Sequence, residues 1–423
     1  MKKISITIIT LLFTFQVFSQ NKKILIKNVT IIPLHINQLL ENKDVILING
    51  EIKEIRDHIE KDTTTYDLGI IDGHEKYLIP AYADAHAHLS EKENLNAYFL
   101  MNLLNGVTTL RSMRGEMWHL EINKKGAFTP KLILSSPPSS RNDNLSGIEA
   151  NNMISAYKKA GFDFMKILSV KDEQTFDYLV ASAKANDFQL AGHCPSSVGI
   201  FKTCKTNVFQ SIEHLGGFFQ LTNVAEINSA INLSITKNVY HCPTLDWYFT
   251  GQVSEEELRH RSGVPFLPTK MVKNWESKIA AHYEKTTKDE RETERKKSEN
   301  QFNKRLDYLK YIYRQGGKLL LSPDASGIYG IPGFGIHTEM KHYANAGISN
   351  FDILKATCYN LSEMLSSQNE WGTIKVGAKS DMVLLNTNPL KNIENTKNIN
   401  GIIFNGMFYS KTELEEKLYL EKR

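Results

Sequence analysis

The sequence predicts an α/β fold in which a parallel β/α barrel is flanked by two β-rich stretches at the chain ends. From Leu78 onward, short apolar segments alternate with polar segments of helical length, a pattern typical of parallel sheets and barrels. Before and after this region the chain carries short β-type runs, with hairpin turns indicated at Asn49-Gly50 and Asn405-Gly406. A length of 423 residues accommodates one barrel with a small attached domain.

The composition is ordinary for a chain that buries a large core, with 41% hydrophobic and 23% charged residues. The 51 Lys and Arg residues against 47 Asp and Glu residues give a net charge of +4. Two of the basic residues, Lys2 and Lys3, belong to the N-terminal segment described next. A charge this close to zero gives no support for nucleic acid or an anionic membrane as a partner.

Residues 1–19 have the pattern of a secretory signal peptide. Lys2 and Lys3 precede an apolar run over 4–18, and Ser19 supplies a small residue before a cleavage site ahead of Gln20. The run is shorter than the about 20 residues that a membrane span needs, and no cysteine stands at the cleavage site, so no membrane anchor is expected. We therefore expect a periplasmic or secreted protein.

The cysteines are few and do not suggest a metal site. They are Cys194, Cys204, Cys242 and Cys358, and none has C-x-x-C spacing. In an exported protein two of them could pair, and the sequence does not choose among the three connectivities. Buried, unpaired thiols are the expectation for most of them.

Eight segments with strand character define the expected barrel. They are residues 78–86, 107–113, 131–137, 163–169, 189–194, 208–214, 239–245 and 318–325. Helical patterns fit between most of them, as at 148–159 and 173–186. Eight such units match a (β/α)8 TIM barrel, which we place at residues 79–364. The β-rich ends, 20–78 and 365–423, are expected to pair with each other in a small composite β-sandwich domain.

Residues 246–317 are too many for a plain connection between two barrel strands. They include a run of alternating charge at 285–300, which is typical of a solvated helix. Two interpretations stay open for this segment: an exposed helical excursion, or a lid that shapes the pocket at the active face.

Groups that can bind a metal stand at the ends of five of the eight expected strands. They are His86 with His88, Lys166, His193, His214 and Asp324. Residues i and i+2 of a strand share a face, so His86 and His88 can bind the same ion. Imidazole nitrogens and carboxylate oxygens suit zinc and its neighbours. Each histidine alone is more simply a core residue, and Asp324 alone could cap a helix, but the joint pattern at the C-terminal strand ends indicates a metal centre.

Lys166 is an unusual residue for the apolar strand that contains it. A lysine within Phe164-Met165-Lys166-Ile167-Leu168 should avoid burial unless it is paired or modified. Burial and nearby cations lower a lysine pKa, and the neutral amine can then react with carbon dioxide to form a carbamate. The carbamate offers two oxygens that can bridge two ions. The simpler alternative is a lysine that pairs with an acid or reaches solvent.

Taken together, these motifs resemble the amidohydrolase superfamily, in particular the binuclear branch of imidazolonepropionase-like enzymes and Xaa-Pro or Xaa-Arg dipeptidases. The resemblance runs from about residue 24 to 410. The matching segments are 79–88, 106–111, 161–167, 192–193, 211–214, 243–245, Asp324, 372–383 and 388–390.

The resemblance implies two divalent ions, most simply zinc. His86, His88 and Asp324 would hold one, His193 and His214 the second, and a carboxylated Lys166 with a hydroxide would bridge both. It also implies that Asp324 takes a proton from the attacking hydroxide and gives it to the leaving amine. The implied activity is hydrolysis of an amide or peptide bond in a dipeptide-like or N-acyl amino acid substrate.

Departures from the family pattern leave the substrate open. Ser112 stands where relatives often have Asp, Ser322-Pro323 precedes Asp324 in place of Gly-Thr, and 215–219 lacks a tyrosine that can touch substrate. Alternatives within the superfamily are a cyclic-amide hydrolase or deaminase, disfavoured because Ser196 stands where deaminases have Glu, and a lactonase. Outside enzymes, a metal-binding protein without activity stays open, and the sequence does not decide between a monomer and a homo-oligomer.

Overall fold

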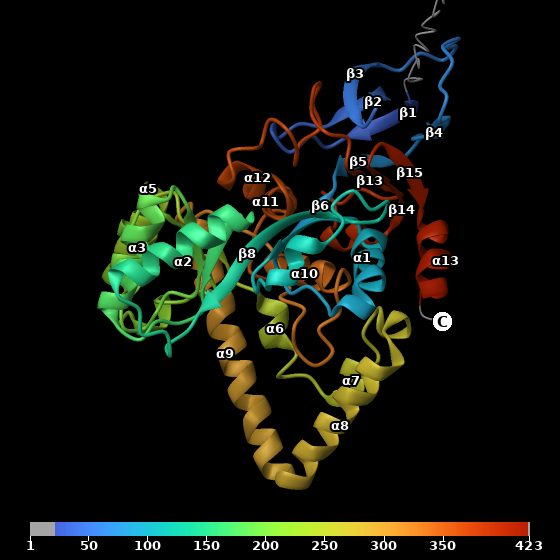
Figure 1. Ribbon diagram of the computed structural model, residues 1–423. Coiled ribbons are helices and arrows are strands. Elements are labelled where there is room, and N and C mark those ends of the chain that lie inside the picture. The colour runs from blue at the N-terminus through green and yellow to red at the C-terminus, as the bar shows by residue number, and fades with distance from the viewer. Residues whose placement is uncertain (1–21, 422–423) are drawn as a thin grey trace, which may run out of the picture.

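The computed structural model describes residues 22–421, so the expected signal peptide lies outside the described residues (Figure 1). Seven parallel strands follow one another around the barrel in chain order. They are β6 (Tyr82–Ala87), β7 (Val107–Ser112), β8 (Lys131–Ser139), β9 (Phe164–Ile167), β10 (Gln189–Gly192), β11 (Phe209–Glu213) and β12 (Tyr240–Cys242). The expected β/α barrel is confirmed.

The eighth barrel segment, expected as a strand at 318–325, closes the barrel without forming a regular strand. Leu319 bridges His241 of β12, and the N–H of Ala85 in β6 donates to the carbonyl of Leu321 at 3.3 Å. The N–H of Leu321 donates instead to Ala356 at 3.1 Å, outside the barrel. Pro323 has no N–H to donate. The hydrogen-bond ladder toward β6 is therefore too sparse for a strand.

Helices cover the outside of the barrel, and a cluster of apolar side chains packs in its interior. The helices that follow barrel strands are α1 (Leu95–Leu104), α2 (Gly147–Ala160), α3 (Glu173–Ala185), α4 (Ile200–Lys205), α5 (Val224–Thr236), α10 (Gly335–Asn345), α11 (Asn350–Thr357) and α12 (Tyr359–Met364). Ala85, Ile133, Phe164, Ala191 and Tyr240, from five different strands, belong to one buried cluster. This packed interior holds the strand ends, and hence the site, in place.

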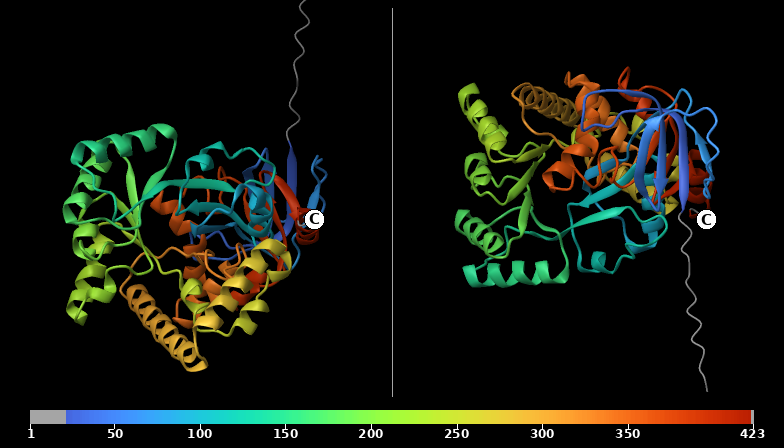
Figure 2. Two further views of the ribbon diagram at one scale, coloured as in Figure 1. Left: turned by 60° about the horizontal axis from the view of Figure 1, so that its bottom comes forward. Right: turned by 90° about the horizontal axis from the view of Figure 1, so that it is seen from above.

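Both chain ends contribute to one eight-stranded mixed sheet (Figure 2). Its strands are β1 (Lys23–Ile31), β2 (Leu40–Ile48), β3 (Glu51–Asp57), β4 (Ile70–Asp72), β5 (Tyr77–Pro80), β13 (Met382–Leu385), β14 (Ile399–Phe404) and β15 (Met407–Ser410). The join between the two ends is the antiparallel pair β5–β13, in which Leu78 faces Leu384. Ile26, Val45 and Ile403 share a separate core in this sheet. The last helix, α13 (Lys411–Glu421), packs against α1 of the barrel.

The segment 246–317 contains four α-helices, α6 (Leu245–Phe249), α7 (Glu255–Arg259), α8 (Thr269–Lys285) and α9 (Lys288–Arg314). Helices α8 and α9 project from the barrel as a V (Figure 1). The charged run lies in the mostly exposed part of α9, as expected. Trp275 of α8 packs on Tyr329 with ring centroids 5.0 Å apart, and the Tyr329 hydroxyl donates a hydrogen bond to Glu276 of the same helix. The segment is therefore tied to the barrel near the site.

All four cysteines are buried and unpaired, as expected for most of them. Among residues 22–421, no helix combines the length and apolar character that a membrane span requires.

Candidate metal centre

His86, His88 and Asp324 converge at the C-terminal end of the barrel. One ligand atom from each lies within 4.8 Å of the others. The Nε2 atom of His88 is 3.3 Å from Asp324 Oδ1, and the Nε2 atom of His86 is 3.8 Å from Asp324 Oδ2. Two imidazole nitrogens and a carboxylate around one point form a candidate metal site.

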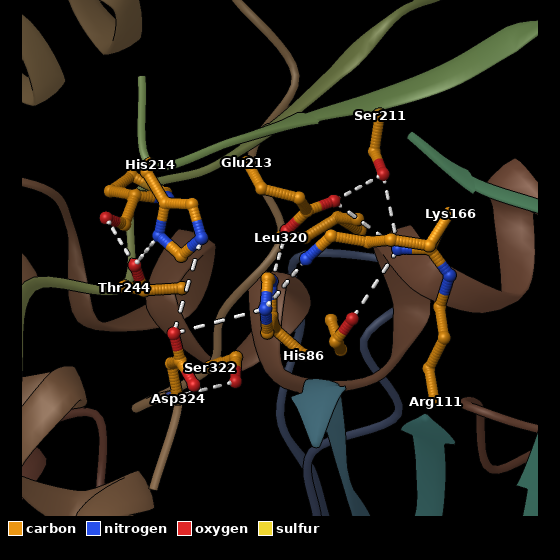
Figure 3. Close-up of polar contacts among 12 residues, drawn as sticks. His86, Arg111, Lys166, Ser211, Glu213, His214, Thr244, Leu320, Ser322 and Asp324 are labelled. Carbon is orange, nitrogen blue, oxygen red and sulfur yellow. Dashed lines mark hydrogen bonds and ion pairs between the residues drawn. The ribbon is translucent and has the colours of Figure 1, made fainter. Parts of the chain in front are cut away.

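Lys166 and His214, which the sequence also singled out, lie beside this group (Figure 3). Lys166 Nζ is 3.4 Å from His86 Nε2, and His214 Nε2 is 4.0 Å from Asp324 Oδ2. The ring of His193 lies 4.9 Å from the ring of His214, measured between centroids. The structure thus brings all six residues into one continuous cluster.

Three site residues at neighbouring strand ends have left-handed backbone conformations. The φ angles are 60° at His214, 53° at Thr244 and 48° at Asp324. Such values are costly for residues with a Cβ and persist where surrounding structure enforces them. At each of these points the chain leaves the barrel wall, and the turn directs the side chain toward the site.

Buried partners determine which nitrogen of each histidine faces the centre. Glu213 Oε2 lies 2.8 Å from His86 Nδ1, and Thr244 Oγ1 lies 2.6 Å from His214 Nδ1. The Thr244 hydroxyl already donates to the Pro243 carbonyl at 2.8 Å, so it accepts a proton from His214 Nδ1. A carboxylate likewise accepts from Nδ1. Both rings therefore present an unprotonated Nε2 to the centre, the form that binds a metal.

Glu213 belongs to a buried network that sequence reasoning did not assign. Its Oε1 accepts a hydrogen bond from Ser211 Oγ at 2.5 Å and lies 3.4 Å from Arg111 Nη1. Both Glu213 and Arg111 are fully buried, and the guanidinium stacks on Phe164 at 4.4 Å. The sequence did contain a signal for this pair. Arg111 and Glu213 have opposite charges, and each stands within an apolar barrel strand, where a buried charge needs a partner.

Asp84 and Ser322 connect the chain segment that carries His86 and His88 with the segment that carries Asp324. Asp84 Oδ1 accepts the backbone N–H of His86 at 3.0 Å and the hydroxyl of Ser322. The Ser322 oxygen in turn accepts the backbone N–H of Asp324 at 3.2 Å. Ser322 is one of the departures from the family pattern, and here it links β6 to the closing segment of the barrel.

Burial sets the charge states of the cluster. It lowers the pKa of His88 to about 3 and of His193 to about 4, and it holds the pKa values of His86 and His214 well below 6.5. Burial also lowers the pKa of Lys166 and raises that of Asp324 to about 7. Neutral imidazoles beside a buried carboxylate are a donor set that fits a divalent transition ion.

A cavity of about 620 Å³ opens next to the candidate metal site. His88 lines it, together with Ala325 and Ser326, which directly follow Asp324. Helix α8 also contributes to the lining, through Lys270, Met271, Asn274, Trp275 and Lys278. The excursion after β12 therefore forms one wall of this cavity.

Solved structures with this fold align over nearly the whole chain. A Xaa-Pro dipeptidase with methionine bound in its active site is 18% identical, with a TM-score of 0.70 and coverage of 92% of this chain and 100% of its own. Bottromycin amidohydrolase is 18% identical, with a TM-score of 0.75 and coverage of 96% and 91%. The ochratoxinase of A. niger is 14% identical, with a TM-score of 0.67 and coverage of 92% and 96%.

No protein-family model and no curated protein matches the sequence. The structural neighbours are members of the amidohydrolase superfamily, and the chain has the fold of that superfamily. The resemblance indicated by the sequence motifs is thereby confirmed at the level of the fold.

Proposed function

We propose that this protein is a metal-dependent hydrolase that cleaves an amide or peptide bond in a dipeptide-like or N-acyl amino acid substrate. The supporting observation is the convergence of His86, His88 and Asp324 at the C-terminal end of the barrel, where enzymes of this architecture carry their active sites. The adjacent cavity of about 620 Å³ is in the range for a small-molecule substrate.

The proposed ligand set is the one that the sequence predicts. His86, His88 and Asp324 would hold one divalent ion, and His193 and His214 the second, most simply zinc in both cases. Lys166 would bridge them after its neutral amine adds to carbon dioxide and loses a proton, which gives a carbamate. Its burial supports this step, since the lowered pKa of Lys166 favours the neutral amine. When bound, such ions activate water and polarise a carbonyl oxygen.

Asp324 is the proposed proton carrier. Its Oδ2 lies within 4.0 Å of both His86 Nε2 and His214 Nε2, so the carboxylate borders both proposed ion positions. A carboxylate there can accept a proton from the attacking water and deliver it to the nitrogen of the leaving amine. Ser326 Oγ donates to Asp324 Oδ1 at 2.7 Å, which orients the carboxyl group and leaves Oδ2 for the proton.

A screen of the purified protein with zinc against dipeptides and N-acyl amino acids tests this proposal. We expect release of free amine that stops on metal removal and falls by about 10²–10⁴-fold in kcat with Asp324→Asn. Asp307→Asn, on the exposed face of α9, is the matched control and should retain activity. Cleavage of lactones or esters without cleavage of any amide would favour the lactonase alternative instead.

The proposal also includes the location of the protein, which we expect to be exported from the cytoplasm. The Lys-led apolar run ending at Ser19 predicts removal of residues 1–19 and a periplasmic or secreted location. N-terminal sequencing of the protein from a secreting host should then begin at or near Gln20, and a chain that still carries Met1 would contradict export by cleavage.

A further inference from the structure

The cavity beside the metal centre carries unpaired positive charge. Arg114, Lys270 and Lys278 line it, and none of the three forms an ion pair within residues 22–421. Two acidic residues, Glu91 and Glu116, also line the cavity. Glu116 is engaged elsewhere, since its Oε2 accepts a hydrogen bond from Trp118 Nε1 at 2.8 Å. The cavity is therefore set up to take an anionic group.

Arg114 differs from the two lysines because its backbone is held on both sides. The N–H of Met113 donates to the carbonyl of Ala87 at 2.9 Å, next to His88, and the N–H of Gly115 donates to Ser135 Oγ at 2.9 Å. A Cβ at Gly115 would lie 1.7 Å from the carbonyl oxygen of Ser135, so the chain passes β8 closely at this point. The turn that carries Arg114 is thus clamped between β6 and β8.

Arg114 and His88 line the same cavity from adjacent strand ends. A guanidinium binds a carboxylate through two parallel hydrogen bonds, which sets the orientation of the bound molecule as well as its affinity.

We propose that Arg114 binds the free carboxylate of the substrate, so that the site selects N-acylated amino acids and dipeptides with a free carboxyl group over their neutral carboxamides. This inference rests on the proposed function and names the substrate feature that the site selects. The carboxylate would bind at Arg114, with the scissile amide toward His88 and Asp324. Lys270 and Lys278 of α8, which line the same cavity, would add electrostatic attraction.

Binding can be measured separately from turnover in the full-length Asp324→Asn protein loaded with zinc. Calorimetric titration would use N-acetylglycine, N-acetyl-L-leucine and N-acetyl-L-methionine, each beside its carboxamide. We expect at least one acid to bind about 10-fold or more tightly than its amide. Adding Arg114→Gln should remove that preference. Arg114→Lys should retain part of it, because a lysine keeps the positive charge but cannot form the two parallel hydrogen bonds of a guanidinium.

The control is Arg314→Gln, since Arg314 is an exposed arginine at the end of α9 that does not line the cavity. It should leave the preference unchanged. Equal binding of acids and amides, no binding of any acid, or a preference that survives Arg114→Gln would overturn the inference. If acids bind through Arg114 but the wild-type protein cleaves none of them, the inference stands and the proposed hydrolase function fails. If the wild-type protein cleaves acids and carboxamides with equal kcat/KM, the inference alone fails.

Discussion

The Glu213 carboxylate lies 2.8 Å from Nδ1 of His86, and its other oxygen lies 3.4 Å from the guanidinium of Arg111. One buried network of polar contacts therefore connects three strands. Arg111 belongs to β7, Glu213 to β11 and His86 to β6. Since none of these side chains reaches solvent, the arrangement that orients His86, a proposed metal ligand, also balances the charge inside the barrel.

Replacing one member of the Arg111–Glu213 pair should destabilise the protein strongly. Glu213→Gln leaves the Arg111 charge buried without compensation, which costs about 3–5 kcal/mol. Metal affinity should also fall by about 10–100-fold, because a neutral amide orients His86 less firmly than the carboxylate does. Chemical denaturation and metal titration measure the two effects.

The double variant Arg111→Met, Glu213→Gln is the matched control for the charge effect. It removes both charges, so its loss of stability should be smaller than the sum of the two single losses. Additive losses would show that the two charges are not coupled.

Lys166→Ala should lose metal and activity, with partial recovery in the presence of short carboxylic acids that supply the missing oxygens. Lys166 is 3% exposed and lies 3.4 Å from His86, so a small acid could enter the space left by its side chain. Lys171→Ala, an exposed lysine that follows the same strand, should change neither property. A carbamate signal in ¹³C NMR after labelling with ¹³C-bicarbonate, present in the wild type and absent in Lys166→Ala, tests the modification directly.

Metal content should be close to two ions per chain by elemental analysis. His193→Ala should reduce it to about one, because His193 belongs to the second proposed position and lies beside His214 rather than beside Asp324. His241→Ala provides a control, since His241 is buried in β12 but bonds to Ser234 at 3.0 Å, outside the cluster. One ion in fully active wild-type protein would contradict the binuclear site.

Stability should depend on pH through the pair of His58 and Asp44, which lies in the composite sheet. His58 Nδ1 lies 2.8 Å from Asp44 Oδ1, and this hydrogen bond raises the pKa of His58 above 6.5. Burial raises the pKa of Asp44, but hydrogen bonds from Asn28, His58 and Ile59 outweigh it and leave the pKa below 3.8.

Since the folded pKa of His58 is raised, its contribution is complete below 6.5 and is lost as the pH rises through the folded value. The contribution of Asp44 is present above 3.8 and is lost as the pH falls through its lowered value. His58→Gln should therefore lower Tm more at pH 5.5 than at pH 8.5, whereas the exposed His74→Gln should show no such difference. An equal effect at both pH values would show that the ion pair does not stabilise the sheet.

Local patterns in the sequence were sufficient for the barrel, for the composite sheet at the chain ends and for the six clustered residues. His86, His88, Lys166, His193, His214 and Asp324 each follow or end an apolar segment, and the C-terminal ends of parallel strands meet on one face of a barrel. That rule brings them together without any knowledge of side-chain contacts.

Only the tertiary structure could decide the contacts that give these residues their charge states and orientation. Glu213 and His86 are separated by 127 positions, and Ser322 and Asp84 by 238, so no local pattern links them. The same holds for Arg114, which follows β7 and lines one cavity with residues of α8. Segment type follows from the periodicity of neighbouring residues, whereas side-chain pairing depends on how the closed barrel places distant strands, which a single sequence does not contain.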